Sequence, residues 1–310
     1  MLSEAKPGAP QRTRWQRIVF RLDAYERLIR LDKPIGILLL LWPTLSALWI
    51  ASDGRPRLQL VLIFTVGTIL MRSAGCAIND WADRGFDAHV KRTAKRPLAA
   101  GEIAPMEALA LSATLAFCAF LIIIPTNATT ILLSLPAVAI AAAYPFFKRF
   151  FVLPQAFLGV AFSFGIPMAF AAVFDRVPVL AWLMLLLNLF WVIAYDTEYA
   201  MVDRDDDMRL GLRTSAIACG RFDVTVVMIC YGVYLVGMVW IGMERAMGML
   251  YFLRLLAALA CALWHLNLIR NRDRAGCFKA FLHNHWFGLA VFGGIALDFA
   301  VRLNGWPRPP

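Results

Sequence analysis

Residues 59–87 read QLVLIFTVGTILMRSAGCAINDWADRGFD, a long apolar run that leads directly into a group of acidic residues. Positions 59–78 contain a single charged side chain, that of Arg72. A helix needs roughly 20 apolar residues to cross a bilayer, and in lipid its backbone groups must hydrogen-bond internally. This stretch therefore predicts a membrane-spanning helix with carboxylates at one end.

Apolar runs of this kind recur along nearly the whole chain. Of its 310 residues, 60% are hydrophobic and 17% are charged, and the mean hydropathy is +0.65. A soluble domain of this length would expose part of this apolar sequence, so the excess must face lipid. We predict an all-α integral membrane protein in which nine transmembrane helices form a bundle. The predicted spans lie near 34–51, 59–78, 106–124, 130–147, 153–174, 179–200, 224–243, 248–270 and 279–303.

The net charge of +10 follows the predicted topology and does not indicate a nucleic-acid partner. If the amino terminus lies in the cytoplasm, the inside segments hold 23 Lys and Arg residues and the outside segments hold six. Such an excess in cytoplasmic loops fixes the orientation of a membrane protein. We therefore predict that the amino terminus and the two longest loops, 79–105 and 201–223, face the cytoplasm.

Segments outside the predicted spans divide the chain into three parts. Residues 1–33 form an N-terminal tail and a basic amphipathic segment, which we expect to lie on the inner leaflet. Residues 34–303 form the membrane domain, and 304–310 form a Pro-rich C-terminal stub. The six cysteines form no C-x-x-C pair, so we expect them to have packing roles. The four histidines do not cluster usefully apart from His283 and His285 at the start of the last span, and we expect that pair to be interfacial.

The two long loops contain the same acidic pattern. Asp83-Arg84-Gly-Phe-Asp87 and Asp203-Arg204-Asp-Asp-Asp207 both read D-R-x-x-D. On a helix, aspartates at i and i+4 face the same way with about 6 Å between their Cβ atoms, and they repel each other without a cation. Extending the adjoining spans as helices predicts two stripes that face one central cavity. The first stripe is Arg72, Cys76, Asn79/Asp80, Asp83 and Asp87, and the second is Asp196, Tyr199, Asp203 and Asp207.

Two facing carboxylate groups suit Mg²⁺ and a diphosphate. Mg²⁺ prefers oxygen ligands and binds through one or two carboxylates plus substrate phosphates. An allylic diphosphate leaves as an anion and creates a carbocation, which metal ions and basic groups stabilise and a bundle shields from water. The basic residues that fit the anionic group are Arg84, Lys91, Arg92, Lys95, Arg96, Arg204, Arg209 and Arg213.

Simpler interpretations account for part of this pattern. An acid-rich loop at a membrane face is commonly just solvated, and Lys148 and Arg149 also suit a topological anchor. The bases of 91–96 equally suit lipid headgroups. Arg72 and Asp196 are harder to explain in this way, because ionisable groups within spans are costly and usually functional.

Five blocks of the sequence resemble a known family. Asn79-Asp80-Trp-Ala-Asp83-Arg-Gly-Phe-Asp87 matches the N-D-x-x-D-x-x-x-D signature of the UbiA-type intramembrane prenyltransferases. The blocks 31–44, 89–98 and 144–149 resemble the 4-hydroxybenzoate polyprenyltransferases within it. Residues 195–207 resemble the second acidic motif of the family, with Glu198 where the family pattern has Gln.

The resemblance implies a nine-helix fold, dependence on Mg²⁺, and a cytoplasm-facing cavity with a lateral opening for a lipid tail. The implied reaction joins an all-trans polyprenyl group, from its diphosphate, to the ring of 4-hydroxybenzoate beside the hydroxyl. This is a step of ubiquinone biosynthesis, and it implies the inner membrane of a bacterium.

By motif position, the resemblance also assigns roles to residues. It implies that Mg²⁺ and diphosphate are held by Asn79, Asp83, Asp87, Asp203 and Asp207. It implies a catalytic role for the four aspartates of that set and for Arg149. The expected substrate-binding residues are Arg72, Asp80, Lys91, Arg92, Tyr144, Lys148 and Asp196. Our own hypothesis is that Arg72, about two helical turns from Asn79, pairs with the carboxylate of the aromatic acid.

Three alternatives remain open at this point. A sister enzyme has the same chemistry with homogentisate, dihydroxynaphthoate or haem as acceptor, and the blocks 31–44 and 89–98 argue against it. A divalent-cation transporter predicts acids deep within spans, whereas most acids here lie at one membrane edge. A lipid phosphotransferase is expected to have a D-G-x-x-A-R spacing, which the sequence lacks.

Overall fold

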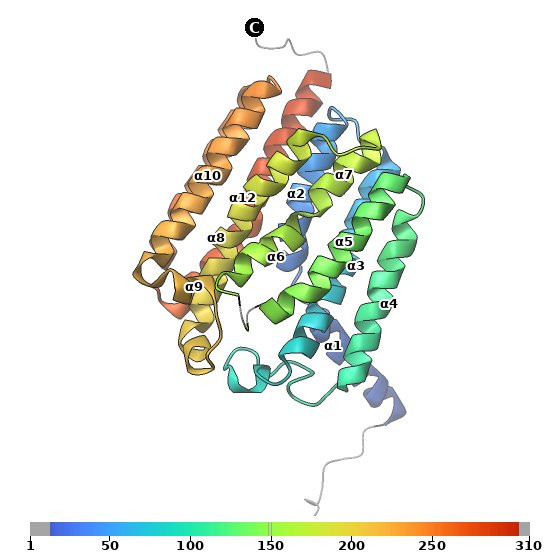
Figure 1. Cartoon of the computed structure of the whole chain (residues 1–310), viewed down its shortest axis with the longest axis vertical. Coiled ribbons are helices and arrows are strands. Elements are labelled where there is room, and N and C mark those ends of the chain that lie inside the picture. The colour runs from blue at the N-terminus through green and yellow to red at the C-terminus, as the bar shows by residue number, and fades with distance from the viewer. Residues whose placement is uncertain (1–12, 148, 150, 304–310) are drawn as a thin grey trace, which may run out of the picture.

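The described chain is a bundle of helices that run side by side along its long axis (Figure 1). The structure is a computed structural model, and it describes residues 13–147, 149 and 151–303. Throughout these residues the regular structure is helical, with no strand. The predicted fold class is confirmed.

Each predicted span coincides with a helix or with a pair of helices. Eight helical segments of the described chain are long and apolar enough to cross a membrane, counting α6 and α7 as one. The ninth, α2, has 17 residues, which is at the short end of the range for a span. The helices are α2 (Ile35–Ala51), α3 (Leu58–Asp83), α4 (Pro105–Ile123), α5 (Ala128–Phe147), α6 (Pro154–Ser163), α7 (Gly165–Phe174), α8 (Val179–Arg209), α10 (Asp223–Glu244), α11 (Met249–Ile269) and α12 (Arg274–Leu303).

The span predicted near 153–174 is broken in its middle, where α6 ends and α7 begins around Phe164. Pro167 explains the break, because it has no N–H to donate to the carbonyl of Ser163. Gly165 at the break lets α2 approach closely: a Cβ built there lies 2.4 Å from Oγ1 of Thr44. The interrupted helix therefore forms part of the wall of the cavity described below.

The two acidic motifs end their helices differently. The α8 helix continues to Arg209, so Asp196, Tyr199, Asp203 and Asp207 lie on one helix as predicted. The α3 helix ends at Asp83, and Asp87 begins a separate one-turn helix, η1 (Asp87–His89). The prediction that Asp87 continues the α3 stripe is therefore wrong, because the chain turns between these two residues.

The core of the bundle surrounds α8, which packs on α6, α10 and α12. Trp191 and Tyr195 of α8 are fully buried there, as are Tyr231 of α10 and Phe287 of α12. By contrast, α4 and α5 have few buried residues, as is expected of helices that face lipid. Two short elements, α9 (Ser215–Ala218) and η2 (Gly220–Phe222), join α8 to α10.

The amphipathic segment predicted near the amino terminus contains the helix α1 (Arg14–Leu28). Ala24 and Leu28 are buried against the rest of the protein, and Arg27 pairs with Glu102 at 2.5 Å. The opposite face exposes Trp15 and Leu22. Its position on a leaflet remains a prediction, and residues 1–12 and 304–310 of the predicted tail and stub lie outside the described residues.

Candidate active site

The first acidic motif is buried at the end of α3. Asp80, Asp83 and Asp87 are 1%, 2% and 6% exposed. Arg96 joins two of them, because its Nη1 lies 3.0 Å from Oδ1 of Asp80 and 2.8 Å from Oδ2 of Asp87. The hydroxyl of Thr93 donates to the carbonyl oxygen of Asp87 at 2.7 Å, which folds the loop back over the helix end.

The three carboxylates lie close enough to affect one another. Burial raises the pKa of Asp87, and the charges of Asp80 and Asp83 add to that rise while Arg96 opposes it. A site with this much negative charge favours cations.

Arg30 is a member of this site that the sequence analysis missed. It lies in the turn between α1 and α2, and its Nη2 is 2.6 Å from Oδ1 of Asp80. Its φ of 56° is in the left-handed region, which is unusual for a residue with a side chain. The only sequence feature that points to Arg30 is its position directly before the 31–44 block. Its contact depends on the tertiary structure, since 50 residues separate it from Asp80.

The second acidic motif is joined by a direct ion pair to the loop that follows the first motif. Nε of Arg92, in the loop after α3, lies 2.9 Å and 3.1 Å from the two carboxylate oxygens of Asp203 on α8. The Arg92 guanidinium also lies 4.4 Å from the centre of the Tyr199 ring, on the same helix. Burial lowers the pKa of Arg92, but Tyr199 and Asp203 outweigh it and leave the pKa raised, so the guanidinium stays charged. Asp207 is also buried, one turn beyond Asp203.

The end of α5 forms a third side of the site. The Tyr144 hydroxyl donates to Oδ1 of Asn79 at 3.0 Å. Nη2 of Arg149 donates to the carbonyl oxygen of Ala82 at 2.6 Å, beside the first motif. Both residues therefore lie against the end of α3, and their roles at the substrates stay predictions. Lys148, predicted to bind substrate, lies outside the described residues.

Other predicted residues lie at the edge of the site or away from it. Lys91 is exposed on the loop, and Asp196 is partly buried on α8 about two turns before Asp203. Arg84 folds back onto Trp81, and its Nη1 lies 2.7 Å from the backbone carbonyl oxygen of Trp81. Arg204 points to Asp223 of α10 instead. For Arg84 and Arg204, the expectation of a role at the anionic group is wrong.

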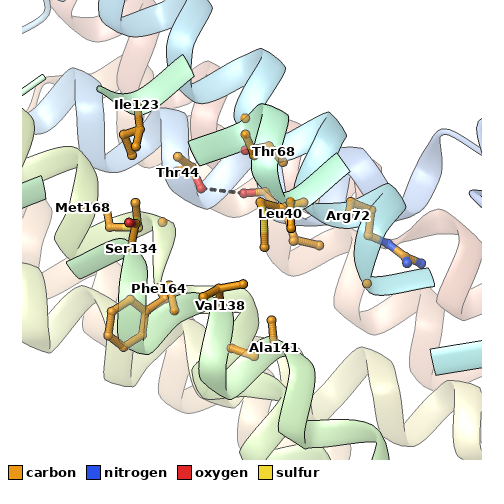
Figure 2. Close-up of a pocket in the computed structure, with 18 of the residues that line it drawn as sticks. Leu40, Thr44, Thr68, Arg72, Ile123, Ser134, Val138, Ala141, Phe164 and Met168 are labelled. Atoms are coloured by element: carbon orange, nitrogen blue, oxygen red, sulfur yellow. Dashed lines mark hydrogen bonds between the residues drawn. The ribbon is translucent and has the colours of Figure 1, made fainter. Parts of the chain in front are cut away.

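An apolar cavity of about 290 Å³ adjoins the acidic site. It lies among α2 to α7, and Tyr144 both lines it and contacts Asn79. Figure 2 shows Arg72 at one end of the cavity and Ile123, Ser134 and Met168 at the other. Three lining residues of α4 and α5 are also exposed, so the cavity reaches the lipid-facing surface between these helices: Phe120, Leu135 and Val138.

Arg72 is the charged residue of this cavity. Its guanidinium lies 6.0 Å from the centre of the Phe162 ring and also contacts Sγ of Cys76. Among the described residues it has no carboxylate within ion-pair distance, and its Nε is buried without a hydrogen-bond partner. Gly36 makes room for it, because a Cβ built there lies 2.7 Å from the guanidinium. The cavity therefore offers a cation to an anionic ligand.

The donor set of the acidic site suits Mg²⁺ in the presence of phosphates. Across the described part of the chain, no group of three or more His, Cys, Asp or Glu residues is arranged to hold a metal by itself. Mg²⁺ does not need such a cage, since it binds through one or two carboxylates plus substrate phosphates and water. Buried aspartates, the Asn79 amide oxygen and nearby arginines are compatible with a Mg²⁺–diphosphate complex.

Comparison with known sequences gives matches over nearly the whole chain. The model of the UbiA prenyltransferase family matches residues 40–288. The 4-hydroxybenzoate octaprenyltransferase of Paraburkholderia xenovorans is 62% identical over 281 residues, covering 91% of this chain and 98% of the relative. The protein of the same name from Ralstonia nicotianae is 62% identical over 282 residues, covering 91% and 97%.

Solved structures share the same fold. A UbiA homologue from Aeropyrum pernix K1 matches with a TM-score of 0.74 at 23% identity, covering 86% of this chain and 98% of that one. A UbiA homologue from Archaeoglobus fulgidus, bound to GPP and Mg²⁺, matches with a TM-score of 0.67 at 18% identity, covering 90% and 99%. These matches confirm the predicted bundle architecture.

Proposed function

The chain belongs to the UbiA prenyltransferase family, and from this premise we propose that it transfers a polyprenyl group from polyprenyl diphosphate to 4-hydroxybenzoate. The new bond forms at the ring carbon beside the hydroxyl, and the reaction is a membrane step of ubiquinone biosynthesis. The names and the 62% identity of the two relatives support this acceptor over homogentisate, dihydroxynaphthoate or haem.

The observation that carries the proposal is the junction of two different environments. The acidic and basic site at the end of α3 meets an apolar cavity at Tyr144. A polyprenyl diphosphate has the same division, with a charged head and a long hydrocarbon tail. A divalent-cation transporter has no use for the apolar cavity, so this second candidate is disfavoured.

The residues proposed to hold Mg²⁺ and diphosphate are Asn79, Asp83, Asp87, Asp203 and Asp207. When bound, Mg²⁺ neutralises the negative charge that develops on the leaving diphosphate. Arg30, Arg92 and Arg96 keep the carboxylates in place through their ion pairs and have further N–H groups for phosphate oxygens. Arg149, beside Ala82, is positioned to add positive charge at the same end of the cavity.

The cavity protects the reactive cation. Its walls are mostly apolar, so water that would convert the prenyl cation to an alcohol is kept away. Arg72 binds the carboxylate of the aromatic acid and thereby orients the ring. The bond from the prenyl C1 to diphosphate oxygen breaks, the ring carbon beside the hydroxyl bonds to C1, and that carbon then gives up its proton to a basic oxygen in the site.

The proposed setting is a bacterial inner membrane, with the acidic site facing the cytoplasm. The 23 Lys and Arg residues on that side support this orientation. The tail of the substrate then enters between α4 and α5, where Phe120, Leu135 and Val138 are exposed.

The test is a transfer assay with membranes from cells that lack their own enzyme of this type and express this chain. The membranes receive Mg²⁺, a labelled polyprenyl diphosphate and one acceptor, and the product is identified by mass. We expect prenylated 4-hydroxybenzoate and none with membranes that carry Asp203→Asn. Product from homogentisate or dihydroxynaphthoate but not from 4-hydroxybenzoate would contradict the proposal.

A further inference from the structure

A second cavity, of about 270 Å³, lies on the other side of α8 from the acidic site. Its lining comes from the end of α8, the start of α10 and the start of α12, which lie at the lower left of Figure 1. Three arginines line it, from α8, the turn before α12, and the start of α12. The lining residues are Met201, Val202, Arg204, Asp205, Met208, Asp223, Arg272 and Arg274.

The carboxylate of Asp223 forms ion pairs with two of these arginines, Arg204 and Arg272. Its side chain is fully buried, and Nε of Arg272 lies 2.9 Å and 3.2 Å from its two oxygens. Nη1 of Arg204 lies 3.3 Å from Oδ2, and the backbone N–H of Val224 donates to Oδ1 at 2.7 Å. Both carboxylate oxygens are therefore engaged, so this buried acid fixes the guanidiniums without presenting a free acceptor to the cavity.

The cavity retains more hydrogen-bond donors than acceptors. A guanidinium has five N–H groups. Within the described part of the chain, the Arg204 side chain donates one hydrogen bond, to Asp223, and its buried Nε has no partner. Arg274 is held loosely, with nitrogens 3.3 Å and 3.4 Å from Oδ2 of Asp206. Asp205 is exposed at the edge of the cavity. A ligand that supplies several acceptor oxygens to convergent arginines matches this arrangement.

The surroundings of the cavity resemble a membrane boundary. Met208 and Phe222 are 52% and 55% exposed beside it, and the Arg221 guanidinium lies 4.8 Å from the centre of the Phe222 ring. Basic pockets between transmembrane helices on the cytoplasmic side bind acidic lipid headgroups. We propose that this cavity binds a phosphate group, presented either by an acidic lipid of the inner leaflet or as free diphosphate. The site is separate from the proposed transfer reaction and does not depend on it.

Thermal unfolding of the purified full-length chain in detergent tests the proposal. The probes are phosphatidylglycerol, phosphatidylcholine and inorganic pyrophosphate. We expect phosphatidylglycerol to raise Tm more than phosphatidylcholine does. In Arg274→Gln, apparent affinity for phosphatidylglycerol should fall about fivefold, because one arginine at an anionic surface contributes about 1 kcal/mol.

Arg270→Gln is the matched control, since it removes the same charge from an exposed position nearby that does not line the cavity. It should respond as the wild type does. If pyrophosphate raises Tm and the effect is lost in Arg274→Gln only, the phosphate site is supported and its ligand is free diphosphate. Arg274→Ala, which also removes the charge, replaces the Gln variant if the latter is unstable. Equal responses to both lipids combined with no effect of pyrophosphate, or equal responses of Arg274→Gln and Arg270→Gln to every probe, would overturn the proposal.

Discussion

Arg92 and Asp203 form an ion pair in which Nε of the guanidinium lies within 3.1 Å of both carboxylate oxygens. The two residues are 111 positions apart, on the loop after α3 and on α8. Their side chains are 27% and 9% exposed, so solvent screens the pair only partly. This contact joins the loop that follows the first acidic motif to the second motif on α8.

The two-oxygen contact of Arg92 predicts that a positive charge at this position is not sufficient for full activity with the polyprenyl diphosphate. Arg92→Lys keeps the charge but loses the planar group that contacts both oxygens. We expect kcat/KM for the polyprenyl diphosphate to fall about tenfold, the cost of one charge-assisted hydrogen bond of about 1.5 kcal/mol, with little change in KM for 4-hydroxybenzoate. Steady-state kinetics in membranes measure both constants. Arg84→Lys, on the same loop but folded onto Trp81, is the control, and equal losses in the two variants would refute the role of Arg92.

Arg72 is predicted to bind the carboxylate of the aromatic acid. Arg72→Leu should raise KM for 4-hydroxybenzoate at least about tenfold, because a charge-assisted hydrogen bond contributes about 1.5–3 kcal/mol. KM for the diphosphate should change little. Unchanged affinity for the aromatic acid, at normal protein levels, would show that another residue binds it.

Gly36 provides a second approach to the same contact. Gly36→Ala places a methyl group 2.7 Å from the Arg72 guanidinium, which must then move. We expect the same selective rise in KM for 4-hydroxybenzoate, smaller than in Arg72→Leu. Gly232→Ala on α10 is the control, since a Cβ there has no neighbour within 4 Å. If the two alanine variants have the same KM for 4-hydroxybenzoate, the position of the Arg72 guanidinium does not matter for binding this substrate.

The apolar cavity is predicted to hold the prenyl tail. Gly67 lines it, and a Cβ built at this position meets nothing within 4 Å, so a larger side chain fits and occupies the cavity. Gly67→Leu should slow transfer from a long polyprenyl diphosphate about tenfold, and transfer from geranyl diphosphate much less. Competition between the two donors, read by product mass, measures this preference. Gly232→Leu should keep the wild-type preference, and a Gly67→Leu enzyme that does the same would locate the tail elsewhere.

The pH dependence of the alkylation rate of Cys219 tests the electrostatic surroundings of the second cavity. Burial raises the pKa of the Cys219 thiol, and the negative charge of Asp223 adds to the rise. The thiolate is the form that reacts with alkylating agents, so at a given pH less of it is present than for an ordinary thiol. We expect the alkylation rate to reach half its maximum above pH ~8.5, the ordinary thiol value. Mass spectrometry of the peptide resolves this site, and a midpoint at or below 8.5 would contradict the described environment.

The sequence predicts the membrane helices well because apolar length and internal backbone bonding leave few alternatives. It also places Asp203 and Asp207 on one helix, since α8 contains no Gly or Pro and the first glycine after it is Gly211. The same reasoning is wrong for Asp87, because the chain turns at 84–86, where Gly85 interrupts the motif. The break at Phe164 also had a signal, in Gly165 and Pro167, that hydropathy alone does not detect.

Contacts between helices that are distant in the chain do not follow from the sequence alone. Glu198 accepts hydrogen bonds from Tyr231 at 3.0 Å and from Asn284 at 2.8 Å, all three fully buried. His265 lies 2.9 Å from the same Tyr231 hydroxyl and 3.0 Å from His283, two contacts that the sequence alone does not predict. An ionisable residue within a span signals that a partner exists. Its identity depends on how α8, α10, α11 and α12 pack.

The most direct test of the account is equilibrium binding of an unreactive polyprenyl diphosphate analogue to the purified protein, with and without Mg²⁺. The account predicts Mg²⁺-dependent binding to the wild type and its loss in both Asp83→Asn and Asp203→Asn, with turnover lost as well. Asp53→Asn, an exposed aspartate at the opposite end of α2 from Pro34, should bind as the wild type does. Wild-type Mg²⁺-dependent affinity in either Asp83→Asn or Asp203→Asn would show that the two motifs do not hold one diphosphate between them.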